Sequence, residues 1–266
     1  MFRRIFSKKN RVLLSELVRT DFKLRYQGSV LGYAWSLLQP LFFFLILYVV
    51  FTLLKVNKGI PHYSVYLLVG MVLWSFFREM TSGSITSIVG RGDLIRKIRI
   101  PRWIIILSSS FSAAISLVFN LVIILIFLAA NHVGLSINDL WFFLIILEVY
   151  IFSLGIALYL SAAFVKYRDV SYIWDVIIQG GFYLTPIIYP LSKITNLTLQ
   201  KFIMLNPISQ SIQDARYAVV WRGTQTTSDT FAGGPYKFIP FGVVVVVFAA
   251  GLSYFRKQSK TFAEDL

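Results

Sequence analysis

The sequence predicts an all-α integral membrane protein with six transmembrane helices, an N-terminal amphipathic helix at the membrane interface and short re-entrant helices between the fifth and sixth spans. Hydrophobic residues make up 57% of the 266 residues and charged residues only 14%, whereas an ordinary soluble domain is roughly 25% charged. The apolar residues also gather into stretches close to the roughly 20 residues that a helix needs to cross a bilayer core. These two observations exclude a soluble globular fold.

Residues 1–266 are expected to form a single transmembrane domain. Six spans and their connections use nearly all of the sequence, which leaves no room for a nucleotide-hydrolysing domain of ordinary size, on the order of 200 residues. If the protein uses ATP, another chain must therefore bind it. The sequence contains no cysteine, which excludes disulfides, thiolate metal sites and cysteine nucleophiles.

The first element, within residues 1–30, is predicted to be a basic amphipathic helix at the cytoplasmic surface. Its apolar residues recur at helical spacing, and most of its charged residues fall on other faces. The apolar positions are Leu13, Leu14, Leu17, Val18 and Phe22. Such a helix lies in the headgroup region before the chain turns into the membrane near residues 28–32. A passive membrane anchor is the alternative to a functional role.

Five spans are expected within residues 31–189, followed by an extracytoplasmic segment over residues 190–237, a sixth span over residues 238–256 and a cytoplasmic tail over residues 257–266. Hydropathy in windows of about 19 residues predicts these spans. They cover residues 33–54, 63–89, 103–130, 140–165, 172–189 and 238–255.

The distribution of Lys and Arg predicts that both termini lie in the cytoplasm. Eight of these residues precede the first span and five lie in the connection over residues 91–102, and further basic residues follow the fourth and sixth spans. With six crossings these segments share one face, which the positive-inside rule places in the cytoplasm. The formal net charge of +14 is therefore expected to reflect topology and contact with membrane lipids. No nucleic-acid partner is expected, because the basic clusters flank apolar spans and form no separate domain.

The second predicted span carries charged and hydroxyl groups in its second half. Arg78 and Glu79 lie there, followed by several serines and threonines. A charge at the bilayer centre costs about 2.5 to 3.5 kcal/mol on insertion scales, so these side chains are expected to face a partner helix or a water-filled path.

Aromatic residues make up 17% of the sequence, more than two interfacial belts require. Tyr33, Trp35, Trp74 and Phe77 lie close to polar positions. Aromatic faces suit the apolar faces of sugar rings, which makes these residues candidates for lining a path. Packing in the core or in the interfacial belts is the alternative.

The segment between the fifth and sixth spans is too polar to cross the membrane, yet apolar pieces and prolines interrupt it. Proline halts or kinks helices at these points. Non-helical backbone at membrane depth is tolerated only when it is buried in protein or beside a water-filled cavity. We therefore expect short re-entrant helices that form an external gate; an ordinary surface loop is the alternative.

Sequence motifs of catalysis are absent. The sequence contains no G-x-x-x-x-G-K-S/T, no G-x-G-x-x-G and no H-E-x-x-H motif. Its two histidines, His62 and His132, lie in connections without carboxylates at ligand spacing. Ser108, Ser109 and Ser110 lie inside a span, where small polar residues usually pack helices together. A membrane-embedded enzyme of lipid-linked sugar metabolism remains an open alternative, because catalytic groups can be remote in sequence.

Several segments, taken in order, resemble the membrane subunit of type-2 ABC exporters that move polysaccharides, the O-antigen, capsule and teichoic acid permeases. The matching segments are residues 19–26 with Ser29, Leu31, Gly32, Trp35 and Pro40, then residues 93–102, 168–170, 185–190 and 205–207, Arg216, and residues 255–257 and 262–264. Four residues at three sites depart from the family pattern. Ile100 replaces the usual aromatic residue before the proline, Arg91 and Gly92 stand where asparagine is frequent, and Thr185 replaces a commoner serine.

The resemblance implies roles for particular residues. A coupling helix that contacts the ATPase would include Asp93, Leu94, Ile95, Arg96, Lys97, Pro101 and Arg102. A helix that guides the lipid-linked substrate would include Asp21, Lys23, Arg25 and Tyr26. A channel would be lined by Tyr33, Trp35, Trp74, Phe77, Arg78 and Glu79. An outer gate would include Pro186, Tyr189, Pro190, Asn206, Pro207 and Arg216.

The resemblance also implies a function. A homodimer of this chain would sit on two copies of a separate ATPase, which would bind ATP and Mg²⁺, while this chain would bind no cofactor or metal and catalyse no reaction. The pair would export an undecaprenyl-phosphate-linked polysaccharide or teichoic acid across a bacterial cytoplasmic membrane, the inner membrane where there are two. A type-2 ABC exporter of a drug or a lipid is the nearest alternative, and the sequence does not identify the polymer.

Overall fold

The computed structural model describes residues 8–26, 32–55, 59–92, 101–134 and 136–262, and the regular structure within these ranges is helical throughout. The longer helices are α2 (Lys8–Tyr26), α3 (Trp35–Leu53), α4 (Tyr63–Ile85), α6 (Trp103–Ala130), α7 (Trp141–Lys166), α8 (Val170–Leu184) and α12 (Ile239–Gln258). The shorter α-helices are α9 (Leu197–Met204), α10 (Pro207–Val219) and α11 (Thr227–Thr230). Single turns of 3-10 helix are η1 (Gly32–Ala34), η2 (Val89–Arg91), η3 (Ile137–Leu140), η4 (Leu191–Lys193) and η5 (Pro235–Phe238). The all-α fold class is confirmed for the described residues.

A helix occupies the place of each predicted span, and α6 has the bounds predicted for the third. By length and composition, three stretches among the described residues can cross a membrane, Trp103–Ala130, Trp141–Lys166 and Pro235–Gln258. The apolar part of α3 is shorter, α8 has only 15 residues, and α4 ends in polar residues. The count of six spans therefore stays a prediction.

The fifth predicted span ends earlier than its apolar composition suggests. Helix α8 stops at Leu184 instead of continuing to Tyr189, and Thr185 adopts an extended conformation with φ −81° and ψ 137°. The cause is Pro186, because a residue that precedes proline is disfavoured in the α-helical conformation. The residues beyond α8 lead as irregular backbone into η4 and α9.

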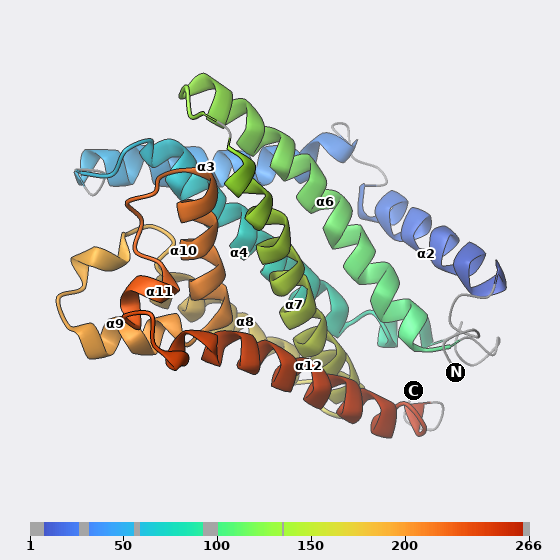
Figure 1. Ribbon diagram of the computed structural model, residues 1–266. Coiled ribbons are helices and arrows are strands. Elements are labelled where there is room, and N and C mark those ends of the chain that lie inside the picture. The colour runs from blue at the N-terminus through green and yellow to red at the C-terminus, as the bar shows by residue number, and fades with distance from the viewer. Residues whose placement is uncertain (1–7, 27–31, 56–58, 93–100, 135, 263–266) are drawn as a thin grey trace.

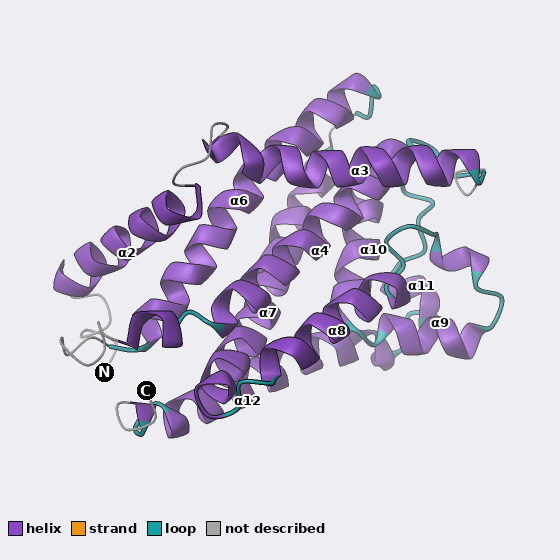
Figure 2. Cartoon of the chain, turned by 180° about the vertical axis from the view of Figure 1, so that it is seen from behind, coloured by secondary structure: helices purple, strands orange, loops and turns teal. Residues whose placement is uncertain are grey.

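Helices α4 and α7 form the centre of the molecule. Helix α4 packs against α6, α7, α10 and α3, and α7 packs against α12 and α10. Helix α2 lies along α6 (Figures 1 and 2), at the end of the molecule where α12 also finishes. Helices α9, α10 and α11 cluster at the opposite end. The two ends of the molecule are thus built from different segments of the chain.

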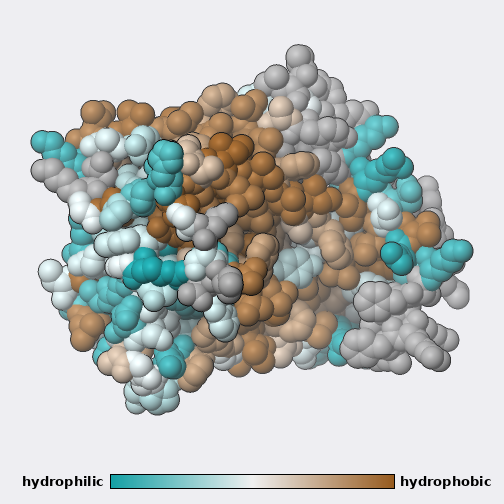
Figure 3. Space-filling view, turned by 45° about the horizontal axis from the view of Figure 1, so that its top comes forward, coloured by the Kyte–Doolittle hydropathy of each residue, from teal (hydrophilic) through white to brown (hydrophobic). Residues whose placement is uncertain are grey.

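The surface of the molecule is polar at its ends and apolar between them. In Figure 3 a broad hydrophobic band crosses the middle of the molecule, and hydrophilic atoms gather on the left, where α9 to α11 lie in Figure 1. Many large apolar side chains on α3, α6, α7, α8 and α12 are exposed. An apolar band between two polar ends is the pattern expected of a protein that is embedded in a bilayer.

Helices α7 and α12 approach closely because glycines face each other. A Cβ atom placed on Gly155 would lie 2.6 Å from the Cα atom of Phe248, and one placed on Gly251 would overlap the backbone of Gly155. Small residues at a helix crossing allow the backbones to meet, which is a common packing device in membranes. This contact fixes α12 against the centre of the molecule.

Candidate functional site

The predicted site residues fall into clusters at the two ends of the molecule and a set between them. At the end that contains α9 to α11, the central residue is Arg216 of α10, which is fully buried. Its Nε donates to the carbonyl oxygen of Tyr66 at 2.9 Å, its Nη1 donates to that of Pro186 at 2.6 Å, and its Nη2 donates to that of Ile187. The guanidinium carbon also lies 3.6 Å from the centroid of the Tyr66 ring.

A buried charge is costly unless hydrogen bonds and dipoles stabilise it. The partners of Arg216 given above are carbonyl dipoles and an aromatic face, which suit a planar guanidinium better than an ammonium group. Arg216 therefore fastens the irregular backbone after α8 to both α4 and α10. It is a structural clamp on the segment predicted to form the outer gate.

Two residues of α4 complete this clamp. Tyr63 donates its hydroxyl hydrogen to the carbonyl oxygen of Ile188 at 3.1 Å. Gly70 leaves room for the guanidinium, because a Cβ atom at this position would lie 3.2 Å from Cζ of Arg216 and closer still to Nη2. The carbonyl groups of residues 186–188 are thus held from two sides. Sequence reasoning missed both α4 residues, since neither stands out within an apolar span.

The other predicted outer-gate residues shape the local backbone. Tyr189 is half-buried and donates its hydroxyl hydrogen to carbonyl groups at the end of α8, and Pro190 precedes η4. Asn206 caps α10 by accepting from the amide of Ile208 at 3.1 Å, and Pro207 is the first residue of that helix. Both residue types are preferred at these positions. Pro186 and Arg216 are in direct contact, whereas Asn206 and Pro207 fix where α10 begins.

A second buried polar cluster joins α10 to α7 and α11. The side-chain amide of Gln210 donates to Asp214 at 2.8 Å and to Glu148 at 3.4 Å. Asp214 also accepts from the amide and the hydroxyl of Thr227, at 3.1 Å and 3.0 Å. Burial raises the pKa of Asp214 above its ordinary value. Glu148 of α7 is likewise buried, and it contacts α10 through Gln210.

At the opposite end, Asp21 of α2 forms an ion pair with Arg91 of η2. Ser108 of α6 donates to the second carboxylate oxygen of Asp21 at 3.2 Å and accepts from Nη1 of Arg91 at 3.0 Å. Partial burial lowers the pKa of Arg91. The three side chains join α2, α6 and the turn that leads into residues 93–100. The sequence suggested a packing role for the serines, and the structure adds this polar contact for Ser108.

The remaining residues predicted to guide the substrate or couple to an ATPase are only partly described. Asp93, Leu94, Ile95, Arg96 and Lys97 lie outside the described residues, and so do the side chains of Arg25 and Tyr26. Lys23 is exposed. Pro101 is half-buried, and the guanidinium of Arg102 lies 5.9 Å from the ring centroid of Phe262. The end of this connection, directly before α6, therefore contacts the segment after α12.

Among the described side chains, the predicted lining residues do not form one surface. Trp74 and Phe77 are only 6% and 5% exposed, with Phe182 at 6.1 Å from Trp74 and Phe152 at 5.8 Å from Phe77, measured between ring centroids. The remaining residues predicted to line a channel are placed differently. Trp35 and Arg78 are exposed, Glu79 accepts from Ser116 of α6 at 3.0 Å, and the side chain of Tyr33 lies outside the described residues.

Two helices expose faces that no described part of this chain covers. On α3, large apolar side chains at helical spacing are exposed, among them Phe42 and Ile46, and on α8 the exposed set includes Tyr172 and Tyr183. The exposed face of α8 also carries Asp175 and Gln179. The two helices meet through Phe43 and Phe182, whose ring centroids are 5.9 Å apart. Because acidic and amide groups are costly against lipid, the α8 face is suited to another protein surface or to water.

No group of three His, Asp or Glu side chains that could hold a metal ion occurs among the residues that the structure describes. The chain belongs to the ABC-2 type transporter family, whose model matches residues 12–220. The family that the sequence motifs resemble is thereby confirmed.

Individual relatives are similar along nearly the whole chain. Two proteins of Klebsiella pneumoniae, each an O-antigen export system permease protein RfbA, are 31% identical over 264 residues and 30% identical over 262 residues. Each alignment covers 96% of this chain and 95% of the relative. The O-antigen export system permease protein RfbA of Myxococcus xanthus is 27% identical over 257 residues, with 96% of each chain covered.

Proposed function

We propose that this chain is the permease subunit of an ATP-driven exporter that moves a lipid-linked polysaccharide out across the bacterial cytoplasmic membrane. The observation that carries the proposal is its similarity, along nearly the full length, to three O-antigen export permeases. The aligned regions of these permeases include both end clusters of this chain and the segments between them. The cargo is of the undecaprenyl-phosphate type, with an O-antigen, a capsule polymer or a teichoic acid as its glycan.

Two copies of the chain enclose the path. The uncovered faces of α3 and α8 support this arrangement, because they carry apolar residues together with Asp175 and Gln179. The two helices themselves contact each other through Phe43 and the buried Phe182. Trp35 and Arg78 are exposed and suit the lining, whereas the buried Trp74 and Phe77 support the wall from behind. Aromatic and polar groups together suit a sugar polymer.

The two end clusters contain the segments that contact the ATPase and form the outer gate. A separate ATPase in two copies binds ATP and Mg²⁺ and contacts the connection over residues 93–102. The ion pair between Asp21 and Arg91 supports a link from that connection to α2, the helix proposed to guide the substrate phosphate. The segment clamped by Arg216 forms the outer gate, and its anchorage on α4 supports coupling of the gate to the centre of the molecule.

Purification of the tagged chain under mild solubilisation tests the proposal. The expected result is a stoichiometric ATPase partner, identified by mass spectrometry, whose ATP hydrolysis rises when a polyprenyl-linked glycan is added. The polyprenyl phosphate without a glycan is the matched control. Stimulation by a drug or by a simple phospholipid, but not by the glycan, would overturn the cargo, and activity on the glycan without any ATPase would overturn the permease role.

A further inference from the structure

A groove with a volume of about 540 Å³ lies between α2 and α6. Leu14 and Val18 of α2 and Phe111 and Ile115 of α6 form its apolar part, and Arg11 and Arg19 lie at its two ends on the α2 side. The α2 residues recur every three or four positions, so they share one face of the helix. This groove is separate from the Asp21 cluster and from the clamp at the opposite end.

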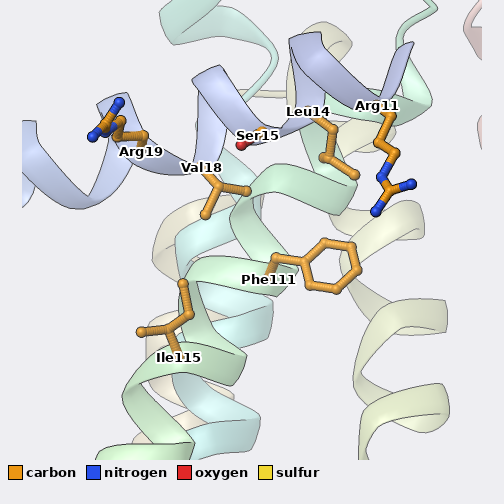
Figure 4. A pocket seen from close by; sticks show the side chains of 7 residues that line it. All are labelled: Arg11, Leu14, Ser15, Val18, Arg19, Phe111 and Ile115. Atoms are coloured by element: carbon orange, nitrogen blue, oxygen red, sulfur yellow. The ribbon is translucent and has the colours of Figure 1, made fainter. Parts of the chain in front are cut away.

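The groove has an exposed apolar surface, its floor, beside a cationic side chain. Figure 4 shows Leu14 and Val18 directed toward the helix that carries Phe111 and Ile115. The side chain of Arg11 extends along the same side and ends beside Phe111, whereas the guanidinium of Arg19 points away from the groove. Arg11 is exposed, and so is Phe111. A ligand that fits here needs an anionic group at Arg11 and a hydrocarbon part beside Phe111.

The charges around the groove favour an anion. No acidic residue lines it, and neither Arg11 nor Arg19 forms an ion pair with a carboxylate in the described part of the chain. Asp21, which lies farther along α2, is already engaged by Arg91 and Ser108. The positive charge of Arg11 is therefore free to attract a phosphate, with which a guanidinium makes two parallel hydrogen bonds.

We infer that this groove binds one anionic phospholipid of the cytoplasmic leaflet. The phosphate group lies at Arg11, and an acyl chain covers Phe111 and Ile115. An amphipathic basic helix lies at the depth of the headgroups, so both parts of such a lipid are present where the groove needs them. A free phosphate would leave the apolar floor uncovered. The inference depends on the placement of α2 at the membrane surface and is independent of the exported cargo.

Native mass spectrometry of the full-length chain, purified with its co-purifying partner and then delipidated, tests this inference. Phosphatidylglycerol and phosphatidylcholine are added back separately. One phosphatidylglycerol per chain is expected to bind more tightly than phosphatidylcholine. Arg11→Gln is expected to weaken phosphatidylglycerol binding about tenfold, the factor for the loss of a direct hydrogen bond to a charged group.

Two further variants make the test specific. Lys8→Gln removes the same charge from the same helix at a position that does not line the groove, and it is expected to bind phosphatidylglycerol as the original chain does. Ile115→Trp fills the groove without a change of charge and is expected to lower binding. If Arg11→Gln fails to fold, the binding of phosphatidylglycerol to Ile115→Trp tests the inference instead.

Three results would overturn the inference. The first is equal binding of phosphatidylglycerol and phosphatidylcholine. The second is equal loss in Arg11→Gln and Lys8→Gln. The third is that an equimolar amount of undecaprenyl phosphate displaces phosphatidylglycerol from the original chain and binds more weakly to Arg11→Gln. That result would assign the groove to the polyprenyl carrier instead.

Discussion

Arg216 shows how one residue can hold an irregular segment in place inside a helical membrane protein. Its three carbonyl partners lie 150, 30 and 29 positions away in sequence. The resemblance to exporter permeases singled out Arg216 as a gate residue, but no sequence pattern identifies the carbonyl groups that a guanidinium will bind. Its burial could be discovered only from the packing of α4 against α10.

Arg216→Met is predicted to destabilise the protein by about 3 kcal/mol, because it leaves buried carbonyl groups without donors. The matched control is Arg222→Met. Arg222 is exposed and pairs with Asp139 at 3.2 Å, so its loss is predicted to cost less than about 1 kcal/mol. Thermal unfolding of both variants in the same detergent measures the difference, and equal shifts would refute the clamp.

Gly70→Ala is predicted to displace the guanidinium of Arg216 and to destabilise the protein, although alanine favours a helix over glycine by about 1 kcal/mol. Gly83 lies on the same helix and serves as the control, because a Cβ atom there would meet only Ser109 Oγ at 3.7 Å. Gly83→Ala is therefore predicted to be neutral or stabilising. Thermal unfolding midpoints that rank the two variants in the opposite order would contradict the crowding at Gly70.

At the scale of elements, the apolar runs predicted the positions of the helices, and local chemistry decided where they end. The first and last residues of helix α6 are those of the third predicted span, because Pro101 precedes this apolar run and polar residues follow it. The fifth predicted span was too long because Pro186 halts α8 within an apolar run. The burial of α10 was not predictable from composition, since several of its buried side chains are polar, among them Gln210, which donates to Asp214 and to Glu148 of α7.

The contact of α2 with η2 gives a prediction at the same scale. Asp21→Arg is predicted to loosen α2 and to uncouple ATP hydrolysis from transport, while Asp21→Arg combined with Arg91→Asp restores the pair with reversed charges. A partly buried pair of this kind contributes roughly 1 kcal/mol, about a fivefold change in the exchange rate of the α2 amides. Hydrogen exchange of α2 and the ratio of glycan transported to ATP hydrolysed are the measurements. Failure of the double variant to recover either quantity would show that Asp21 and Arg91 act separately.

At the scale of the molecule, composition predicted a membrane protein, and the six crossings predicted from hydropathy stay a prediction. Three described stretches are long and apolar enough to cross a membrane alone. Helix α8 is about 22 Å long at 1.5 Å per residue, less than a bilayer core of roughly 30 Å. Its exposed face, which includes Asp175 and Gln179, is unsuited to lipid on its own. The lining of a path could not be predicted from one chain, because a path between two copies depends on a surface that the sequence does not reveal.

Transport of the glycan in a reconstituted system is the most direct test of the proposed export function. The purified chain and its co-purifying ATPase are reconstituted into proteoliposomes with an undecaprenyl-linked glycan in the outer leaflet, and the fraction of glycan accessible to an added glycosidase is followed over time. ATP is expected to move the intact glycan into a protected compartment, and a non-hydrolysable ATP analogue is not. Glycan that stays equally accessible with and without ATP, or that is chemically altered by this chain alone, would contradict the role of this chain as an exporter permease.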